Sequence, residues 1–340
     1  MNNWKAKLKA DPTDWLLEST DPSIRYYTLI DILNKPETDS DVVAAKKDIM
    51  RIGPVPAILD KQREGAYEDG LHRFYLNKYQ GLVWRLILLA ELGATLNDQI
   101  CETCEYLLSH SQIYENGGFT TQSVIETDGK KPGEGIPCLS GNMVWCFINL
   151  GYVDDPRVQN GIGWIINHSH LADGMDQYPG DIRYIGSESC YGKHTCFMGA
   201  VKSLKALAYI PKNHYTKTEA VYDVIAKTTE YMLVHHIYKR SHDLNRVSKP
   251  GWLKFGFPLL YQTDILEILD VLLFLGVRDY RMKDAVEIVK SDQRTNGRWY
   301  SKNATINANN KKLLIPFSRT EQNKWVTLRA MRVLKKWDEF

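Results

Sequence analysis

Two cysteines and one histidine, Cys190, His194 and Cys196, lie within seven residues of one another. Thiolate sulfur and imidazole nitrogen are ligands that zinc prefers, and three such ligands with an open fourth position make a catalytic zinc site. Cys190 and His194 are four residues apart, so on one helical turn their side chains would point the same way. Cysteine is also among the residue types most often buried as packing. A metal site and a sulfur-rich helix start therefore remain as alternatives.

A second group of candidates follows further along the chain. His242, Tyr261 and Asp264 have side chains that can transfer protons, so they are candidates for acid–base chemistry. Asp264 can instead cap the helix that it opens, a role that stabilises a helix by roughly 0.3–1 kcal/mol. Lys239 and Arg240 can hold a carboxylate or diphosphate, and a solvated basic turn is the alternative interpretation.

The composition limits the class of protein. The formal net charge is only +2, which argues against a nucleic-acid binder. No apolar run reaches about 18 residues, so we expect no membrane span. No apolar segment follows the first lysines, so we expect no signal peptide and a cytoplasmic protein. The 19 Tyr, 9 Trp and 9 Phe exceed what a core of this size needs, and the surplus can line a cavity.

One pattern of two helices repeats along the chain. It occupies residues 82–112, 143–170 and 268–293, and a further copy is expected at 196–236. Each copy has a very apolar helix, a short polar turn and an amphipathic helix. The apolar helices of the first three copies end in glycines suited to a left-handed helix terminus: Gly93, Gly151 and Gly276. Asp21 and Asp155, each followed by proline, are expected to cap helices.

The two helices of each copy predict an architecture. The first is apolar almost all round and suits burial on both sides, whereas the second has one face for water. An inner ring of the first kind and an outer ring of the second give an all-α fold, an α/α toroid of about six hairpins. We expect one domain over residues 1–340, with the N- and C-terminal helices closing the ring. An open HEAT-type solenoid is the alternative, but its units of about 40 residues are shorter than the 58 residues from Gly93 to Gly151.

The turns after the amphipathic helices carry a family resemblance. They read QRTNGRW from Gln293, QIYENGGF from Gln112 and QREGAY from Gln62, while HSHLADGM stands in the second copy. These turns resemble the Gln…Gly-x-Trp repeat of squalene–hopene cyclases and the related turns of protein prenyltransferase β subunits. The resemblance extends from about residue 15 to 337. We expect a structural role, in which the glutamine amide bonds backbone and the aromatic ring stacks over the next turn.

The resemblance also implies site residues. In prenyltransferase β subunits a zinc cysteine precedes one inner helix, and a zinc histidine followed by threonine begins the next. Cys138 and His194 stand at those places here, 56 residues apart, which implies that both bind zinc. The family's aspartate would fall on Ile136, which cannot bind metal, so Cys190 is the expected third ligand.

The function implied is that of a prenyltransferase- or cyclase-like enzyme acting on an apolar, isoprenoid-like substrate in a central cavity, with zinc at its rim. Trp84 and Trp145 would line that cavity. The Asp-x-Asp-Asp acid of class II terpene cyclases is missing, so squalene-type cyclisation is not expected. A cavity that binds a lipid or peptide without chemistry and a helical scaffold with a filled centre remain as alternatives. Protein prenyltransferases pair with an α subunit, so the resemblance leaves such a partner open.

Overall fold

The computed structural model describes residues 4–63, 74–76, 78–125, 134–174, 190, 194–303 and 322–339. Helices dominate these residues, so the predicted all-α class is confirmed. The one sheet in the described residues is a hairpin of two short strands, β1 and β2. Within the same ranges, no helix has the length and apolar character needed to cross a membrane.

The elements fall into three sets. The inner helices are α2 (Pro22–Tyr27), α5 (Leu82–Glu91), α7 (Pro137–Asn149), α10 (Phe197–Ala208), α12 (Ile265–Phe274) and α15 (Lys324–Glu339). The outer helices are α3 (Ser40–Ile49), α4 (Pro54–Arg63), α6 (Asp98–His110), α8 (Pro156–His168), α11 (Glu219–Val234) and α13 (Lys283–Ser291). The remaining elements are η1 (Trp4–Lys7), α1 (Thr13–Leu16), η2 (Thr28–Ile32), β1 (Lys239–Arg240), β2 (Asp243–Val247), η3 (Pro250–Leu253) and η4 (Tyr280–Met282).

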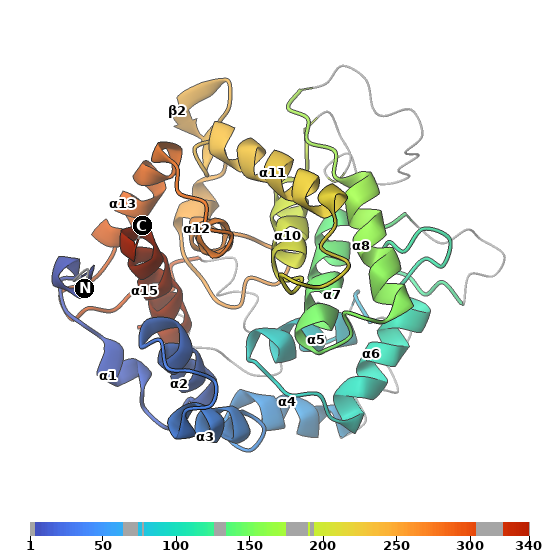
Figure 1. Cartoon of the computed structure of the whole chain (residues 1–340), viewed down its shortest axis with the longest axis horizontal. Coiled ribbons are helices and arrows are strands. Elements are labelled where there is room, and N and C mark those ends of the chain that lie inside the picture. Colours follow the sequence, from blue (N-terminus) through green and yellow to red (C-terminus); the bar gives the residue numbers. More distant parts are fainter. Residues whose placement is uncertain are drawn as a thin grey trace.

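The inner helices surround a central region, and the outer helices lie around them (Figure 1). Contacts run in chain order from α5 to α7, α10, α12 and α15, and α15 also packs against α2. Burial follows the predicted pattern. Every residue of α5 from 82 to 90 is buried, whereas α6 buries only one face: Ile100, Thr103, Cys104, Leu107 and Leu108.

The inner helices end as their glycines predict. Gly93, Gly151 and Gly276 have φ angles of 74°, 90° and 77°, in the left-handed region that other residues avoid. The predicted caps are also confirmed, because Asp21 accepts a hydrogen bond from the Ile24 amide and Asp155 accepts one from the Arg157 amide. Helix boundaries in this fold are therefore encoded by local backbone chemistry.

The glutamine turns have the structural role that was expected. The Gln293 side-chain amide donates to the carbonyl oxygens of Gly297 (2.9 Å) and Ala10 (3.0 Å), and its oxygen accepts from the Lys9 amide (2.7 Å). Gln112 likewise donates to Gly117 within its own turn and to a carbonyl of α8. Each glutamine thus joins its own hairpin to a neighbouring segment. The expected copy at Gln62 lies outside the described side chains.

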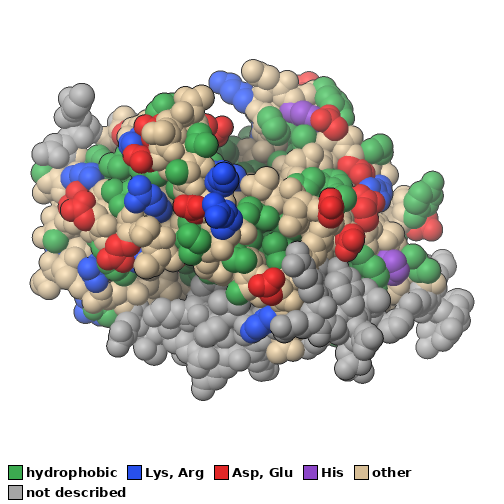
Figure 2. All heavy atoms as spheres, turned by 90° about the horizontal axis from the view of Figure 1, so that it is seen from below, with side chains coloured by type: hydrophobic (Ala, Val, Ile, Leu, Met, Phe, Trp, Pro, Cys, Tyr) green, Lys and Arg blue, Asp and Glu red, His purple; other side chains and the backbone are tan. Residues whose placement is uncertain are grey.

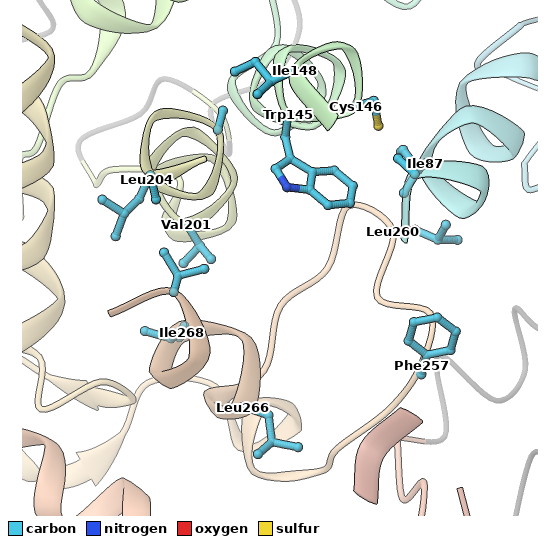
Figure 3. Packing of buried hydrophobic residues seen from close by; sticks show 14 of the residues in the cluster. Ile87, Trp145, Cys146, Ile148, Val201, Leu204, Phe257, Leu260, Leu266 and Ile268 are labelled. Carbon is cyan, nitrogen blue, oxygen red and sulfur yellow. The ribbon is translucent and has the colours of Figure 1, made fainter. Parts of the chain in front are cut away.

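The hydrophobic core lies where the inner helices converge. Figure 3 shows Trp145 of α7 projecting toward the space between α5 and α10, and it places Leu260 and Phe257 on the segment that precedes α12. The outer surface is mixed in charge on the face seen in Figure 2, where basic and acidic side chains are interspersed.

Candidate functional site

Four aromatic rings gather at the ends where the inner helices begin. The Trp84 ring, at the start of α5, lies 4.8 Å from Tyr75, 5.1 Å from Tyr79 and 6.1 Å from Tyr261, centroid to centroid. The Trp84 indole also donates to the Tyr75 carbonyl at 2.9 Å. We call Tyr75, Tyr79, Trp84 and Tyr261 the aromatic cluster. It unites Trp84 and Tyr261, two of the residues proposed from the sequence.

A cation accompanies the aromatic cluster. The Lys78 ammonium lies 4.9 Å from the Tyr261 ring centroid and 5.3 Å from that of Tyr75, which are cation–π distances. Burial, followed by a hydrogen bond with Tyr261, raises the pKa of Tyr79. Burial also raises the pKa of Tyr75. Both phenols therefore stay protonated at neutral pH, and neither can serve as a base.

Three thiols lie beside these rings. Cys138 is buried at the start of α7, and Cys196 caps α10 by accepting a hydrogen bond from the Gly199 amide at 3.4 Å. Cys196 also shares a hydrogen bond with Cys190. Cys138 and Cys190 lie near enough to the Tyr75 hydroxyl that a charge on either would raise its pKa. We call Cys138, Cys190 and Cys196 the thiol group.

Cys138 and Cys196 are in their protonated form at neutral pH, because the pKa of each is raised. Burial is the main reason that the pKa of Cys138 rises to about 12, and the neighbouring Cys190 adds to it. A protonated thiol is a poor nucleophile, because the thiolate is the reactive form. Cys138 therefore needs a bound cation or another activating group before it can react at pH 7.

The expected zinc ligands do not converge in this structure. His194 is two-thirds exposed, and its Nδ1 lies 3.1 Å from Asp173 Oδ1, whereas Cys138 is buried. Across the part of the chain that the structure describes, no three His, Cys, Asp or Glu side chains are grouped so that they could hold a metal ion. Zinc binding stays a prediction.

The basic and histidine candidates lie on the β1–β2 hairpin, at the periphery in Figure 1. His242 is exposed between the two strands, and Lys239 forms an ion pair with Asp284 of α13 at 2.5 Å. Arg240 pairs with Asp243 in the strand register. The structure therefore does not bring Lys239, Arg240 or His242 to the aromatic cluster.

Asp264 has the capping role. Its two carboxylate oxygens accept from the amides of Glu267 (3.0 Å) and Gly256 (3.2 Å), and the residue is fully buried. Burial raises its pKa to about 6. A substrate has no access to this carboxylate, so the structure supports the helix cap and not the acid–base role.

Trp145 faces a charged centre and not an apolar one. Its ring lies 3.6 Å from the Lys205 ammonium, beside a cavity of about 190 Å³ that we call the axial cavity. The charged side chains that line it are Asp31, Glu91, Lys205, Glu267, Asp270, Arg329, Arg332 and Lys336. The expectation that this part of the centre is an apolar pocket is wrong.

Ion pairs hold this centre together. Lys202 and Glu267 are 2.6 Å apart, and Lys205 and Arg329 both bind Glu91, at 2.6 and 2.8 Å. Arg332 bridges two further carboxylates, Asp31 and Asp270, each at 2.7 Å. Taking such charges out of water costs several kcal/mol per ion unless they are paired. Their pairing across four inner helices and η2 therefore fixes how those elements face one another.

This ion-pair network was not predicted from the sequence, although a signal was present. Three inner helices carry like charges three residues apart on otherwise apolar faces. These pairs are Lys202 and Lys205, Glu267 and Asp270, and Arg329 and Arg332. Residues at that spacing share a face of a helix. Acidic and basic pairs on different buried helices predict a charged centre.

Comparisons with known proteins add no relative to this description. No protein-family model and no curated protein matches the chain.

Proposed function

We propose that the chain is an α/α toroid of the terpenoid cyclase and protein prenyltransferase type. The contacts between inner helices in chain order support this, as does the packing of the last helix, α15, against α2. The turns at Gln112 and Gln293 also support it, because each joins its own hairpin to a neighbouring segment of the chain.

We further propose that an apolar, isoprenoid-like substrate binds at the aromatic cluster. The observation that carries this proposal is the meeting of Tyr75, Tyr79, Trp84 and Tyr261 with the thiol group at one end of the inner helices. Aromatic faces attract positive charge. They would therefore stabilise the charge that develops when an allylic substrate ionises, which favours a transferase- or cyclase-like enzyme.

Binding without chemistry is the second candidate. It is favoured by the raised pKa of Cys138, about 12, since a protonated thiol does not attack a substrate. The two candidates share the aromatic cluster and differ only in turnover.

Titration with a fluorescent farnesyl analogue tests the binding site. Tyr261 is only half-buried, so Tyr261→Ala should leave the fold intact and weaken binding by about tenfold through the lost ring contacts. Tyr280→Ala is the matched control, because that ring is 78% exposed and lies in η4, outside the aromatic cluster. Equal affinities of Tyr261→Ala and wild type would remove the aromatic cluster from the site.

Mass spectrometry of a reaction with farnesyl diphosphate and a thiol peptide separates the two candidates. A prenylated or cyclised product supports the enzyme. Binding with no product after many hours supports the non-catalytic candidate.

A further inference from the structure

Three hydrogen-bond donors on the wall of the axial cavity have no partner among the described residues. They are the hydroxyls of Tyr27 and Tyr209 and the ammonium of Lys336. Burial raises the pKa of both tyrosines, so they remain hydroxyls that can donate. All three residues are partly exposed, and donors that line a cavity are satisfied by water or by a ligand. These three therefore point to an occupant that accepts hydrogen bonds.

Lys336 is also a cation that forms no direct ion pair in the described structure. The four carboxylates on the cavity wall are bound by other side chains: Asp31 and Asp270 by Arg332, Glu91 by Lys205 and Arg329, and Glu267 by Lys202. The second oxygen of Asp270 is buried without a hydrogen-bond partner. Lys336 instead lies over the Phe274 ring, 5.1 Å from its centroid. Burial lowers its pKa, and the charges of Asp270, Asp31 and Glu339 offset that effect only in part. A negative charge in the cavity would give the Lys336 ammonium a direct partner.

Helix electrostatics accounts for only part of this arrangement. Several inner helices end near the cavity, with Glu91 and Phe274 as their last residues, and cations stabilise helix C-terminal ends. That effect explains a lysine at this place. It does not explain two tyrosine hydroxyls that find no acceptor on the same wall.

The size and charge of the axial cavity select the class of ligand. A volume of about 190 Å³ holds roughly six water molecules, so only a small molecule fits. The wall carries four carboxylates and four cations, so it has no surplus of positive charge for a diphosphate or another multiply charged anion. A single carboxylate needs one cation and a few donors, which Lys336, Tyr27 and Tyr209 provide.

We propose that the axial cavity binds a small organic monocarboxylate. Its oxygens accept hydrogen bonds from Lys336, Tyr27 and Tyr209, and its short apolar end packs against the surrounding aromatic rings, such as Phe274. The site is independent of the aromatic cluster and thiol group, so either proposal can fail without the other.

Calorimetric titration of the full chain with butyrate and with butyramide tests the charge requirement. The two probes have nearly the same shape, and only butyrate carries a negative charge. We expect saturable binding of butyrate and an affinity for butyramide lower by about tenfold or more. Equal binding of the two, or no saturable binding of butyrate, would overturn the proposal and leave the cavity to water.

Two variants test the residues. Lys336→Met removes the cation, and Tyr209→Phe removes one hydroxyl while keeping the ring that stacks on Phe274 at 4.7 Å. Each should weaken butyrate binding by about tenfold, the effect expected for one charged or buried hydrogen bond. Lys290→Met and Tyr222→Phe, both on outer helices, are the matched controls and should bind like wild type. Unchanged affinity in both test variants, with circular dichroism confirming the fold, would contradict the assignment.

Discussion

The Lys202 ammonium on α10 lies 2.6 and 2.7 Å from the two carboxylate oxygens of Glu267 on α12. Both side chains are almost fully buried, at 2% and 3% exposure. Burial opposes ionisation of Glu267, but the nearby cations, Lys202 first, hold its pKa below the usual value. The pair therefore stays charged at neutral pH and ties two inner helices together.

Breaking this pair should be strongly destabilising. Lys202→Met leaves the Glu267 carboxylate buried with less compensation, and we expect a loss of about 3–5 kcal/mol in the free energy of unfolding. Urea denaturation at pH 7 measures it. The double variant Lys202→Met/Glu267→Leu should recover much of the loss, since it leaves no unpaired charge.

The exposed pair of Lys227 and Asp223 is the control for this experiment, with both side chains more than half exposed. Lys227→Met should change the stability by less than about 1 kcal/mol. A loss in Lys202→Met no larger than that of the control would mean that the buried pair does not hold α10 and α12 together.

Glu91 should make stability fall at low pH. Burial opposes its ionisation, but Lys205 and Arg329 outweigh that effect and lower its pKa to about 2, from 4.5. A lowered carboxyl pKa contributes stability above pH 4.5 that is lost as the pH falls toward 2. The contribution is about 3 kcal/mol at pH 7. Urea midpoints measured from pH 5 to pH 2 should fall in wild type and fall less steeply in Glu91→Gln; parallel curves would contradict the pairing.

Asp264 should act in the opposite direction and in another pH window. Its folded pKa of about 6 lies above its usual 3.8 because of burial. A raised carboxyl pKa gives stability that is complete below pH 3.8 and lost as the pH rises through 6. Asp264→Asn keeps an oxygen that can accept from the Glu267 amide. Between pH 4 and 7 its unfolding free energy should be flatter than that of wild type, and an unchanged pH slope would show that Asp264 titrates normally.

Gln293 should matter for the whole fold and not only for its own turn. Its three hydrogen bonds to Gly297, Ala10 and Lys9 connect the end of α13 to the N-terminal segment. At about 1 kcal/mol for each, Gln293→Ala should cost about 2–4 kcal/mol in urea unfolding. Gln122→Ala, at an exposed position, should be nearly neutral. A Gln293→Ala variant as stable as this control would contradict a structural role for the turn.

The elements of the fold were predictable where one segment of chain decides them. Gly93, Gly151 and Gly276 mark helix ends because their backbone needs a positive φ, and Asp21 and Asp155 mark helix starts because their side chains reach the next amides. Such requirements are satisfied within a few residues. They can therefore be inferred from a single sequence.

The candidate site was predictable only in part, for a physical reason. Trp84 and Tyr261 meet because both lie where an inner helix begins, a position that the repeat fixes. The partner of His194 is Asp173 in a different loop, which no local pattern indicates. The Arg329–Glu91 pair joins residues 238 positions apart in the sequence, so it depends on how α15 meets α5 in the folded chain.

The aromatic cluster as a substrate site is tested most directly by carbon–proton NMR spectra of protein with labelled tyrosines, recorded while farnesol is added. The account predicts saturable shifts for the rings of Tyr75, Tyr79 and Tyr261, which surround Trp84, and unchanged signals for Tyr27 and Tyr209 in the axial cavity. Shifts confined to Tyr27 and Tyr209, or no shift in any tyrosine at saturating farnesol, would contradict it.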